Sequence, residues 1–192
     1  MIENDRFIEE YEMNPQTMIL LPVEYGQELY TKVFELHDEF LSPRSPLEII
    51  RKSCEYFGSS YDGRKNGTKF LTGVVYKAPI IVDSHTSIFS FPTSSPSNPN
   101  CIWICEKHVK RHERVEPKVT KVVFKNGQSF HLPISLNSFV SQRTRTLMLT
   151  SRFMYAIEEM KKKDLNNPSH HEETAEKKTY YWIDFIKGKE RV

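Results

Sequence analysis

Two cysteines and two histidines lie close enough in the sequence to raise the question of a metal site. Cys101, Cys105, His108 and His112 carry the thiols and imidazoles that zinc prefers, at spacings that would face one side of a helix. Ligands spread over that length of one straight helix cannot all reach one tetrahedral ion. The composition of residues 101–105 instead favours a strand, in which the two sulfurs would lie roughly 13 Å apart at about 3.3 Å per residue. We therefore expect no metal site and no cofactor.

The glycine-rich segment GSSYDGRKNG, residues 58–67, is expected to be a loop. Backbone amides of such a loop can hold a phosphate, but this segment lacks the Gly-Lys-Ser or Gly-Lys-Thr order of a nucleotide-binding loop. Its cations Arg64 and Lys65, with Lys69 just beyond it, favour instead a contact with the DNA backbone. The acids and histidines of the chain form no recognisable catalytic pair or triad, so we expect the protein not to be an enzyme.

Charge is strongly segregated along the chain of 192 residues. Residues 1–42 hold two basic residues against ten acidic ones, a net charge of −8. Residues 43–152 hold seventeen against seven, a net charge of +10, and residues 153–192 are balanced at eight each. The central excess is typical of a protein that binds a polyanion, although a solvated basic surface offset by the acidic N-terminus has the same charge pattern. The other candidate DNA contacts in this block are Lys107, Lys110, Arg111 and Arg114 on a strand expected over 102–114, and Arg143 and Arg145, with Arg152, early in a helix.

Turn signals and hydrophobic periodicity predict the elements that position these residues. Two strands are expected over residues 18–23 and 29–36. Ser45-Pro46-Leu47-Glu48 has the order of a helix N-terminus, and apolar residues at helical spacing then continue to about Gly58. Residues 68–132 are rich in β-branched and aromatic residues and predict a sheet.

Three further signals predict the structure of the middle and the end of the chain. Asn126-Gly127 between two apolar stretches predicts a hairpin, and residues 92–100, with three prolines, predict a surface loop. A helix is expected after Asn137-Ser138 and is predicted to end near Met160. Its apolar stripe, which we expect to pack into the core, consists of Val140, Leu147, Met154, Ile157 and Met160.

The fold is expected to be α+β, a single domain over residues 1–160 with an antiparallel, β-rich centre and flanking helices. A flexible polar linker is expected over 161–178 and a C-terminal helix over 179–192. The N-terminus carries acids where a signal peptide needs basic residues, and the longest apolar stretch is too short to cross a bilayer. Three cysteines, an odd number, are too few for a disulfide scaffold. We expect a cytoplasmic protein that makes no membrane contact.

Short motifs between residues 46 and 153 resemble, in the same order, those of the ComK family of competence transcription factors. The longest is FGSSYDGRKNGT at residues 57–68. The others are PIIVD at 79–83, IFSFPT at 88–93, WI at 103–104, HVK at 108–110 and PISLNSF at 133–139, with a weaker likeness at 183–186.

This resemblance implies a transcription activator of genes for DNA uptake, one that acts as a homo-oligomer on paired A/T-rich boxes. Recognition would be largely through the minor groove, whose narrow A-tracts attract arginine and whose pattern mainly separates A·T from G·C pairs. RNA polymerase is a candidate partner. The sequence shows no helix-turn-helix, because the two C-terminal helices are separated by too long a linker. A regulatory protein of the same fold that lacks productive promoter recognition, its basic block masked by the acidic N-terminus, is the alternative.

The resemblance also brings in an adaptor and the Clp protease as candidate partners. The family is controlled by adaptor-directed Clp proteolysis through an apolar-aromatic motif in its C-terminal region. Residues 161–178 are polar and charged and carry no such motif. Control by degradation therefore does not follow from the resemblance.

Overall fold

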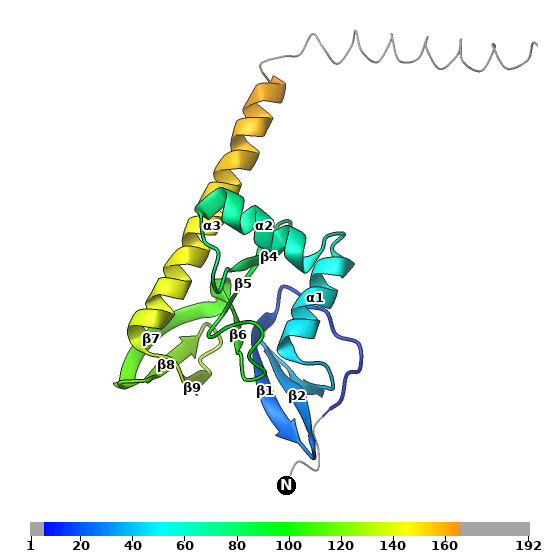
Figure 1. Ribbon diagram of the computed structural model, residues 1–192, viewed down its shortest axis with the longest axis vertical. Coiled ribbons are helices and arrows are strands. Elements are labelled where there is room, and N and C mark those ends of the chain that lie inside the picture. The colour runs from blue at the N-terminus through cyan, green and yellow to red at the C-terminus, as the bar shows by residue number, and fades with distance from the viewer. Residues whose placement is uncertain (1–5, 166–192) are drawn as a thin grey trace, which may run out of the picture. The chain divides into compact units, whose positions relative to one another are not determined.

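The computed structural model describes residues 6–165, which form nine strands and three α-helices (Figure 1). The expected α+β class is confirmed. Tertiary contacts divide the chain into residues 1–152 and residues 153–192. In chain order the elements are β1 (Thr17–Tyr25), β2 (Glu28–Glu35), β3 (Glu39–Ser42), α1 (Pro46–Tyr56), α2 (Tyr61–Thr72), β4 (Ile80–Asp83), β5 (Ile88–Pro92), β6 (Trp103–Cys105), a short 3-10 helix (Glu106–His108), β7 (Val109–Glu116), β8 (Val119–Phe124), β9 (Ser129–Leu132) and α3 (Leu136–Leu165).

A six-stranded antiparallel sheet, in the order β3-β2-β1-β6-β5-β4, forms the middle layer. One of its faces packs against α1 and α2, where Trp103 lies fully buried with Ile49 and Ile50 of α1. Cys54 and Cys105 are buried in the same cluster, as expected for small core residues. The helices therefore form one layer over this sheet.

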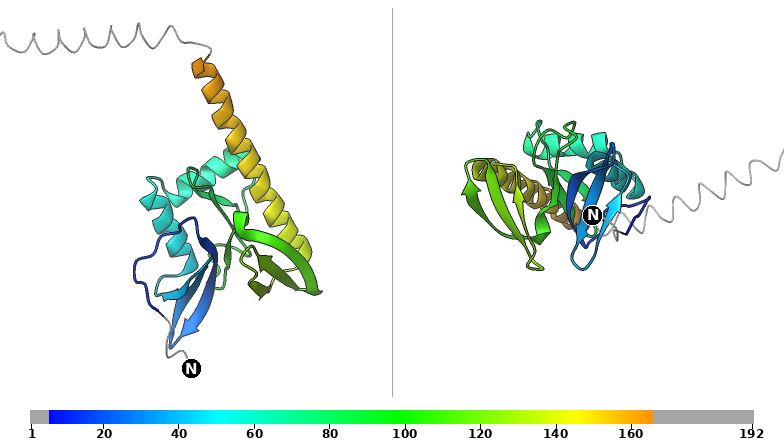
Figure 2. Two further views of the ribbon diagram at one scale, coloured as in Figure 1. Left: turned by 180° about the vertical axis from the view of Figure 1, so that it is seen from behind. Right: turned by 90° about the horizontal axis from the view of Figure 1, so that it is seen from below.

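A three-stranded antiparallel sheet, β7-β8-β9, lies on the other side of the large sheet (Figures 1 and 2). A second apolar cluster fills the space between the two sheets, with Ile19 and Ile104 on one side and Val122 and Phe124 on the other. Phe139, at the start of α3, packs into this cluster against Phe91. The start of α3 is thus anchored beside the small sheet.

Local signals predicted several elements correctly. Both N-terminal strands are present, and α1 begins with a capping box in which Ser45 Oγ accepts from the Glu48 N–H while the Glu48 carboxylate accepts from the Ser45 N–H. The hairpin at Asn126-Gly127 joins β8 to β9, with Gly127 at φ +92°. Within residues 6–165, no helix is both long and apolar enough to cross a membrane.

The expected loop over residues 58–67 is wrong, because most of it is the first half of α2. Ser60 Oγ caps the helix by accepting from the Gly63 N–H at 3.0 Å. Tyr61 and Thr68 are buried on its inner face, and Thr68 Oγ1 donates to the Pro79 carbonyl at 2.8 Å. The cap and this inner face outweigh the cost of two helical glycines, about 1 kcal/mol each.

The single strand expected over residues 102–114 is also wrong. A short 3-10 helix at Glu106–His108 separates β6 from β7 and carries the chain from the large sheet to the small one. His108 is buried in this turn, with Nε2 at 3.0 Å from the Pro15 carbonyl oxygen. Residues 102–114 contain no glycine or proline that would mark a break, so nothing in the sequence indicates that the chain passes from one sheet to the other here.

The apolar stripe expected to bury α3 is wrong, since it lies largely on the exposed side. Val140 is 39% exposed and Leu147 47%, whereas Gln142 and Thr146 are buried. Gln142 Nε2 donates to the Pro92 carbonyl at 2.7 Å and to the Lys77 carbonyl at 3.0 Å, so this polar side chain is satisfied inside. The remaining stripe residues are also exposed, Met154 and Met160, or half-buried, Ile157.

The ends of α3 differ slightly from the prediction. The helix begins at Leu136, where Ser135 Oγ accepts from the Ser138 N–H at 3.3 Å, and it continues to Leu165. Most of the predicted linker and the whole predicted C-terminal helix over 179–192 lie outside the described residues. The domain boundaries stay predictions.

Candidate nucleic-acid interface

Two exposed lysines lie next to each other on α2. Lys65 and Lys69 are one turn apart, on a side of the helix that borders the buried face of Tyr61 and Thr68. Among residues 6–165 neither ammonium has an ion-pair partner. Arg64 is half-buried on the same helix, and its buried Nε has no hydrogen-bond partner within that range.

Hydrogen bonds from α3 place two more arginines beside the C-terminal end of α2. Arg145 Nη1 donates to the Tyr76 carbonyl at 3.5 Å, and Arg152 Nη1 donates to the Leu71 carbonyl at 2.6 Å. The segment 73–77, which follows α2, contributes the exposed Lys77. We call these cations the helical basic group: Arg64, Lys65, Lys69, Lys77, Arg145 and Arg152.

No acid interrupts the helical basic group along the chain. Residues 63–82 contain no Asp or Glu, and neither do residues 136–157. Asp62, in the first turn of α2, precedes these residues and offsets one of the positive charges. The potential over this surface is therefore positive, and phosphates are the complementary ligand.

Apolar side chains stand among these cations. Phe70 is 90% exposed and Tyr76 83% exposed, and Val75 is also exposed. A shallow cavity of about 160 Å³ beside them is lined by Lys65, Asn66, Lys69, Val74 and Val75. Exposed apolar residues rimmed by polar ones are typical of an interaction surface.

A second group of cations lies on β7, an edge strand of the small sheet. Lys110, Arg111 and Arg114 are exposed, and we call them the strand basic group. Arg111 pairs across the ladder with Val123 and Arg114 with Thr120, so the two arginines face opposite sides of the sheet. Glu113 lies between them, paired with Lys121 at 3.3 Å. The cations of the strand basic group are therefore divided between the two faces of the sheet.

Three of the nine predicted contact residues have intramolecular partners within residues 6–165, Arg145 as described above and also Arg143 and Lys107. Arg143 Nε pairs with Glu106 Oε1 at 3.0 Å, and its Nη2 donates to the Val109 carbonyl at 3.2 Å. Lys107 Nζ donates to the Thr86 carbonyl at 3.2 Å. Arg143 is paired with an acid, and Lys107 makes no hydrogen bond to α2 or to residues 73–77, so we do not include these two cations in the interface.

Two histidines of this region, His108 and His112, have lowered pKa values, which favour the neutral imidazole. Burial, together with the neighbouring positive charge of Lys107, lowers the pKa of His108 to about 4. Burial and the Arg143 guanidinium also lower the pKa of His112. Neither histidine adds positive charge at neutral pH.

The four residues first considered for zinc are not gathered into a metal site. Among residues 6–165, no three His, Cys, Asp or Glu side chains are placed to hold an ion. Burial raises the pKa of the Cys105 thiol to about 12, which keeps it protonated.

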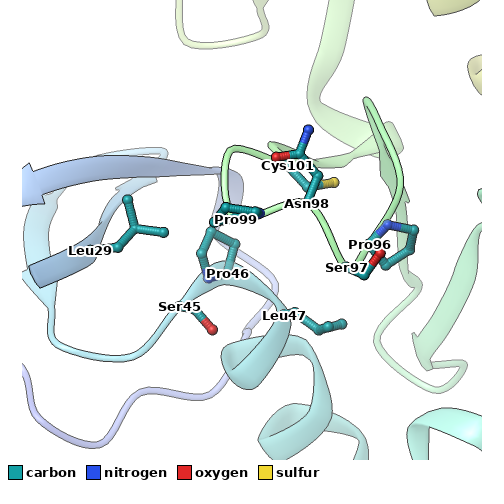
Figure 3. Close-up of a pocket in the computed structure, with 9 residues that line it drawn as sticks. All are labelled: Leu29, Ser45, Pro46, Leu47, Pro96, Ser97, Asn98, Pro99 and Cys101. Carbon is teal, nitrogen blue, oxygen red and sulfur yellow. The ribbon is translucent and has the colours of Figure 1, made fainter.

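A larger cavity, of about 240 Å³, lies between the start of α1 and the loop 93–102 (Figure 3). Its lining is mainly proline, leucine and serine side chains, with Asn98 and Cys101. It contains no acid and no histidine, so the geometry offers no general acid–base pair there.

Phe70 and Lys77, like Val75 and Tyr76, lie on this surface but were absent from the residues that the sequence suggested. Helical periodicity would have found Phe70, since burial of Tyr61 and Thr68 leaves residues 66 and 70 outward. No local signal marks Lys77, which joins the group only because α3 packs beside segment 73–77.

Most of the chain is similar in sequence to known proteins of one family. A family model described as ComK protein matches residues 8–158. The chain is 42% identical over 156 residues to the competence transcription factor of Bacillus subtilis (strain 168), which covers 81% of each chain. No solved structure matches the chain.

Proposed function

The chain belongs to the ComK family, and from this premise we propose that it activates transcription of competence genes by binding A/T-rich double-stranded DNA. The relative's name supports the transcriptional role. The proposal places its action in the cytoplasm, at the chromosome, and gives it no catalytic step.

The observation that carries the proposal is the helical basic group. Four segments from different parts of the sequence bring their cations to one surface, and Asp62 in the first turn of α2 is the acid next to them. The segments are α2, residues 73–77 and two turns of α3. Such a surface binds the DNA backbone, and arginine in a narrow minor groove favours A/T-rich sequence.

We propose the strand basic group as a second phosphate contact. Lys110, Arg111 and Arg114 are exposed and lack ion-pair partners within residues 6–165. Paired A/T boxes would then be bound by more than one copy of the chain, and RNA polymerase remains a candidate partner of that complex. An adaptor for Clp proteolysis also stays a candidate partner.

The test compares a duplex that carries two A/T-rich boxes with a G/C-matched control across a salt series. We expect tight binding to the A/T duplex alone, with log K falling by about 0.9 per phosphate contact per log unit of salt. The double variant Lys65→Gln/Lys69→Gln should weaken binding by about tenfold or more and flatten the salt slope by about two contacts.

The matched control is Lys52→Gln on α1, which removes an exposed lysine paired with Glu55 outside both basic groups. It should bind as wild type does. Equal binding of the two duplexes would contradict sequence-selective activation and favour the alternative, a regulatory protein of the same fold.

A further inference from the structure

Phe70 is the most exposed large hydrophobic residue in the described part of the chain, at 90%. It lies next to Lys69, in the last turn of α2. No aromatic or cation–π contact within residues 6–165 occupies its ring, whereas other exposed aromatic rings, such as Phe7 and Tyr56, pack against neighbours. Nothing in the folded chain accounts for a phenylalanine at this position.

Gly67, one turn before Phe70, is equally unexplained by the fold. It lies within α2 with a helical backbone, and a Cβ built there would meet no atom within 4 Å. Alanine would therefore fit and would favour the helix, since glycine is among the poorest helix formers. A glycine that the fold does not need is expected where another molecule approaches the backbone closely.

The cations around these two residues indicate which molecule approaches. Lys65 and Lys69 lie one turn apart on one side of Phe70, Lys77, Arg145 and Arg152 belong to the same helical basic group, and residues 63–82 contain no acid. Duplex DNA carries phosphates close to the apolar faces of its stacked base pairs. Minor-groove proteins insert Phe, Leu, Ile, Met or Pro between base steps and partly unstack them.

We propose that Phe70 inserts between base pairs in the minor groove of the bound duplex, while the backbone of α2 at Gly67 rests against the sugar–phosphate chain. Lys65 and Lys69, which lie one turn apart on one side of Phe70, neutralise phosphates of the DNA backbone on that side of the inserted ring. The inference rests on the proposed function, because it names the residue that reads deformability in the same complex.

The first experiment follows base unstacking in the full-length protein with 2-aminopurine placed at successive steps of an A/T box. Wild type should raise the fluorescence at one step. Phe70→Ala should lose that rise and bind about tenfold more weakly, with the salt slope unchanged because no cation is removed. Phe70→Leu, which keeps an apolar wedge, should retain most of the rise.

Tyr56→Ala is the matched control, since it removes an exposed aromatic residue on α1 that is 71% exposed. It should behave as wild type. Persistence of the fluorescence rise in Phe70→Ala, while wild type still prefers the A/T duplex, would overturn the wedge and leave the proposed function standing. Loss of the A/T preference in wild type itself would reject both.

The second experiment separates contact with DNA from stability. Gly67→Ala should raise the melting temperature by about 2–4 °C, yet weaken DNA binding severalfold because its methyl group keeps the backbone away from the duplex. Higher stability with unchanged affinity would overturn the close approach. A drop in self-association of Phe70→Ala without DNA, seen by sedimentation velocity, would instead assign the ring to a contact between copies and overturn the insertion.

Discussion

Arg143 and Lys65 carry the same charge but have different environments. Arg143 is half-buried and held by Glu106 and the Val109 carbonyl, while Lys65 is exposed with no ion-pair partner within residues 6–165. The paired guanidinium of Arg143 therefore connects two elements of the fold, whereas the exposed ammonium of Lys65 is available to a ligand. The charge of a residue alone does not separate these roles.

Arg143→Gln should lower the free energy of unfolding by roughly 1–3 kcal/mol, because it leaves the Glu106 carboxylate half-buried without its partner. Urea denaturation measures this loss. The folded variant should keep DNA affinity close to wild type. A large loss of affinity with little loss of stability would show that Arg143 contacts DNA after all.

His108 makes the stability of the fold depend on pH. Its folded pKa, about 4, lies below the ordinary value of 6.5, so the unfolded chain binds a proton that the folded chain does not. Stability is therefore full above about pH 6.5 and falls as the pH drops toward 4, by up to about 3 kcal/mol for this group.

His108→Gln should remove most of this fall, since a glutamine amide can still donate to the Pro15 carbonyl but does not titrate. The measurement is the urea midpoint at several values of pH between 4 and 7. His131→Gln, at an exposed position on β9, is the control and should retain the wild-type dependence. An unchanged dependence in His108→Gln would assign it to other groups.

At the scale of the element, α2 shows how a cap and a buried face can form a helix from a sequence that looks like a loop. Ser60 caps it, Tyr61 and Thr68 anchor it, and Gly73 ends it with φ +73°. Lys65 and Lys69 stand side by side only because this segment is helical. The helix, rather than a flexible loop, therefore fixes their spacing.

Ser60→Ala should lower the free energy of unfolding by about 1 kcal/mol through loss of the cap. Thermal denaturation and circular dichroism would measure the change. Ser59→Ala is a close control, because the neighbouring hydroxyl does not cap α2. If both substitutions lowered the free energy of unfolding equally, the Ser60 cap would not be what stabilises α2.

Within residues 6–152, the acids of the N-terminal segment 6–42 and the helical basic group occupy different regions. The tip of the β1–β2 hairpin and α2 lie at opposite ends in Figures 1 and 2. Acids of the N-terminal part pair locally, Asp38 with Arg6, Glu39 with Lys32 and Glu10 with Arg44. Charges separated by much more than a Debye length of about 8 Å are screened at physiological salt.

The double variant Glu24→Gln/Glu28→Gln, at exposed positions beside the hairpin turn, should therefore change DNA affinity by less than about twofold at 0.15 M salt. Fluorescence anisotropy with an A/T duplex would measure it. A gain of tenfold or more would support masking of the basic surface by the acidic N-terminal segment.

Features that depend on short-range chemistry could be predicted from the chain alone. The capping box at Ser45 and the Asn126-Gly127 turn were identified correctly because each depends on residues within a few positions of one another. The motifs between residues 46 and 153 likewise indicated the family, which the comparisons then confirmed. The excess of cations in residues 43–152 was also evident from the chain alone.

The faces that are buried and the cations that come together depend instead on packing between distant segments. Gln142 is buried because carbonyls of residues 77 and 92, far away in the sequence, accept its hydrogen bonds, and this leaves Val140 and Leu147 exposed. Lys77 and Arg152 join Lys65 and Lys69 for the same reason, the packing of α3 beside α2. Such pairings depend on contacts between distant segments, and local hydrophobic periodicity carries no information about them.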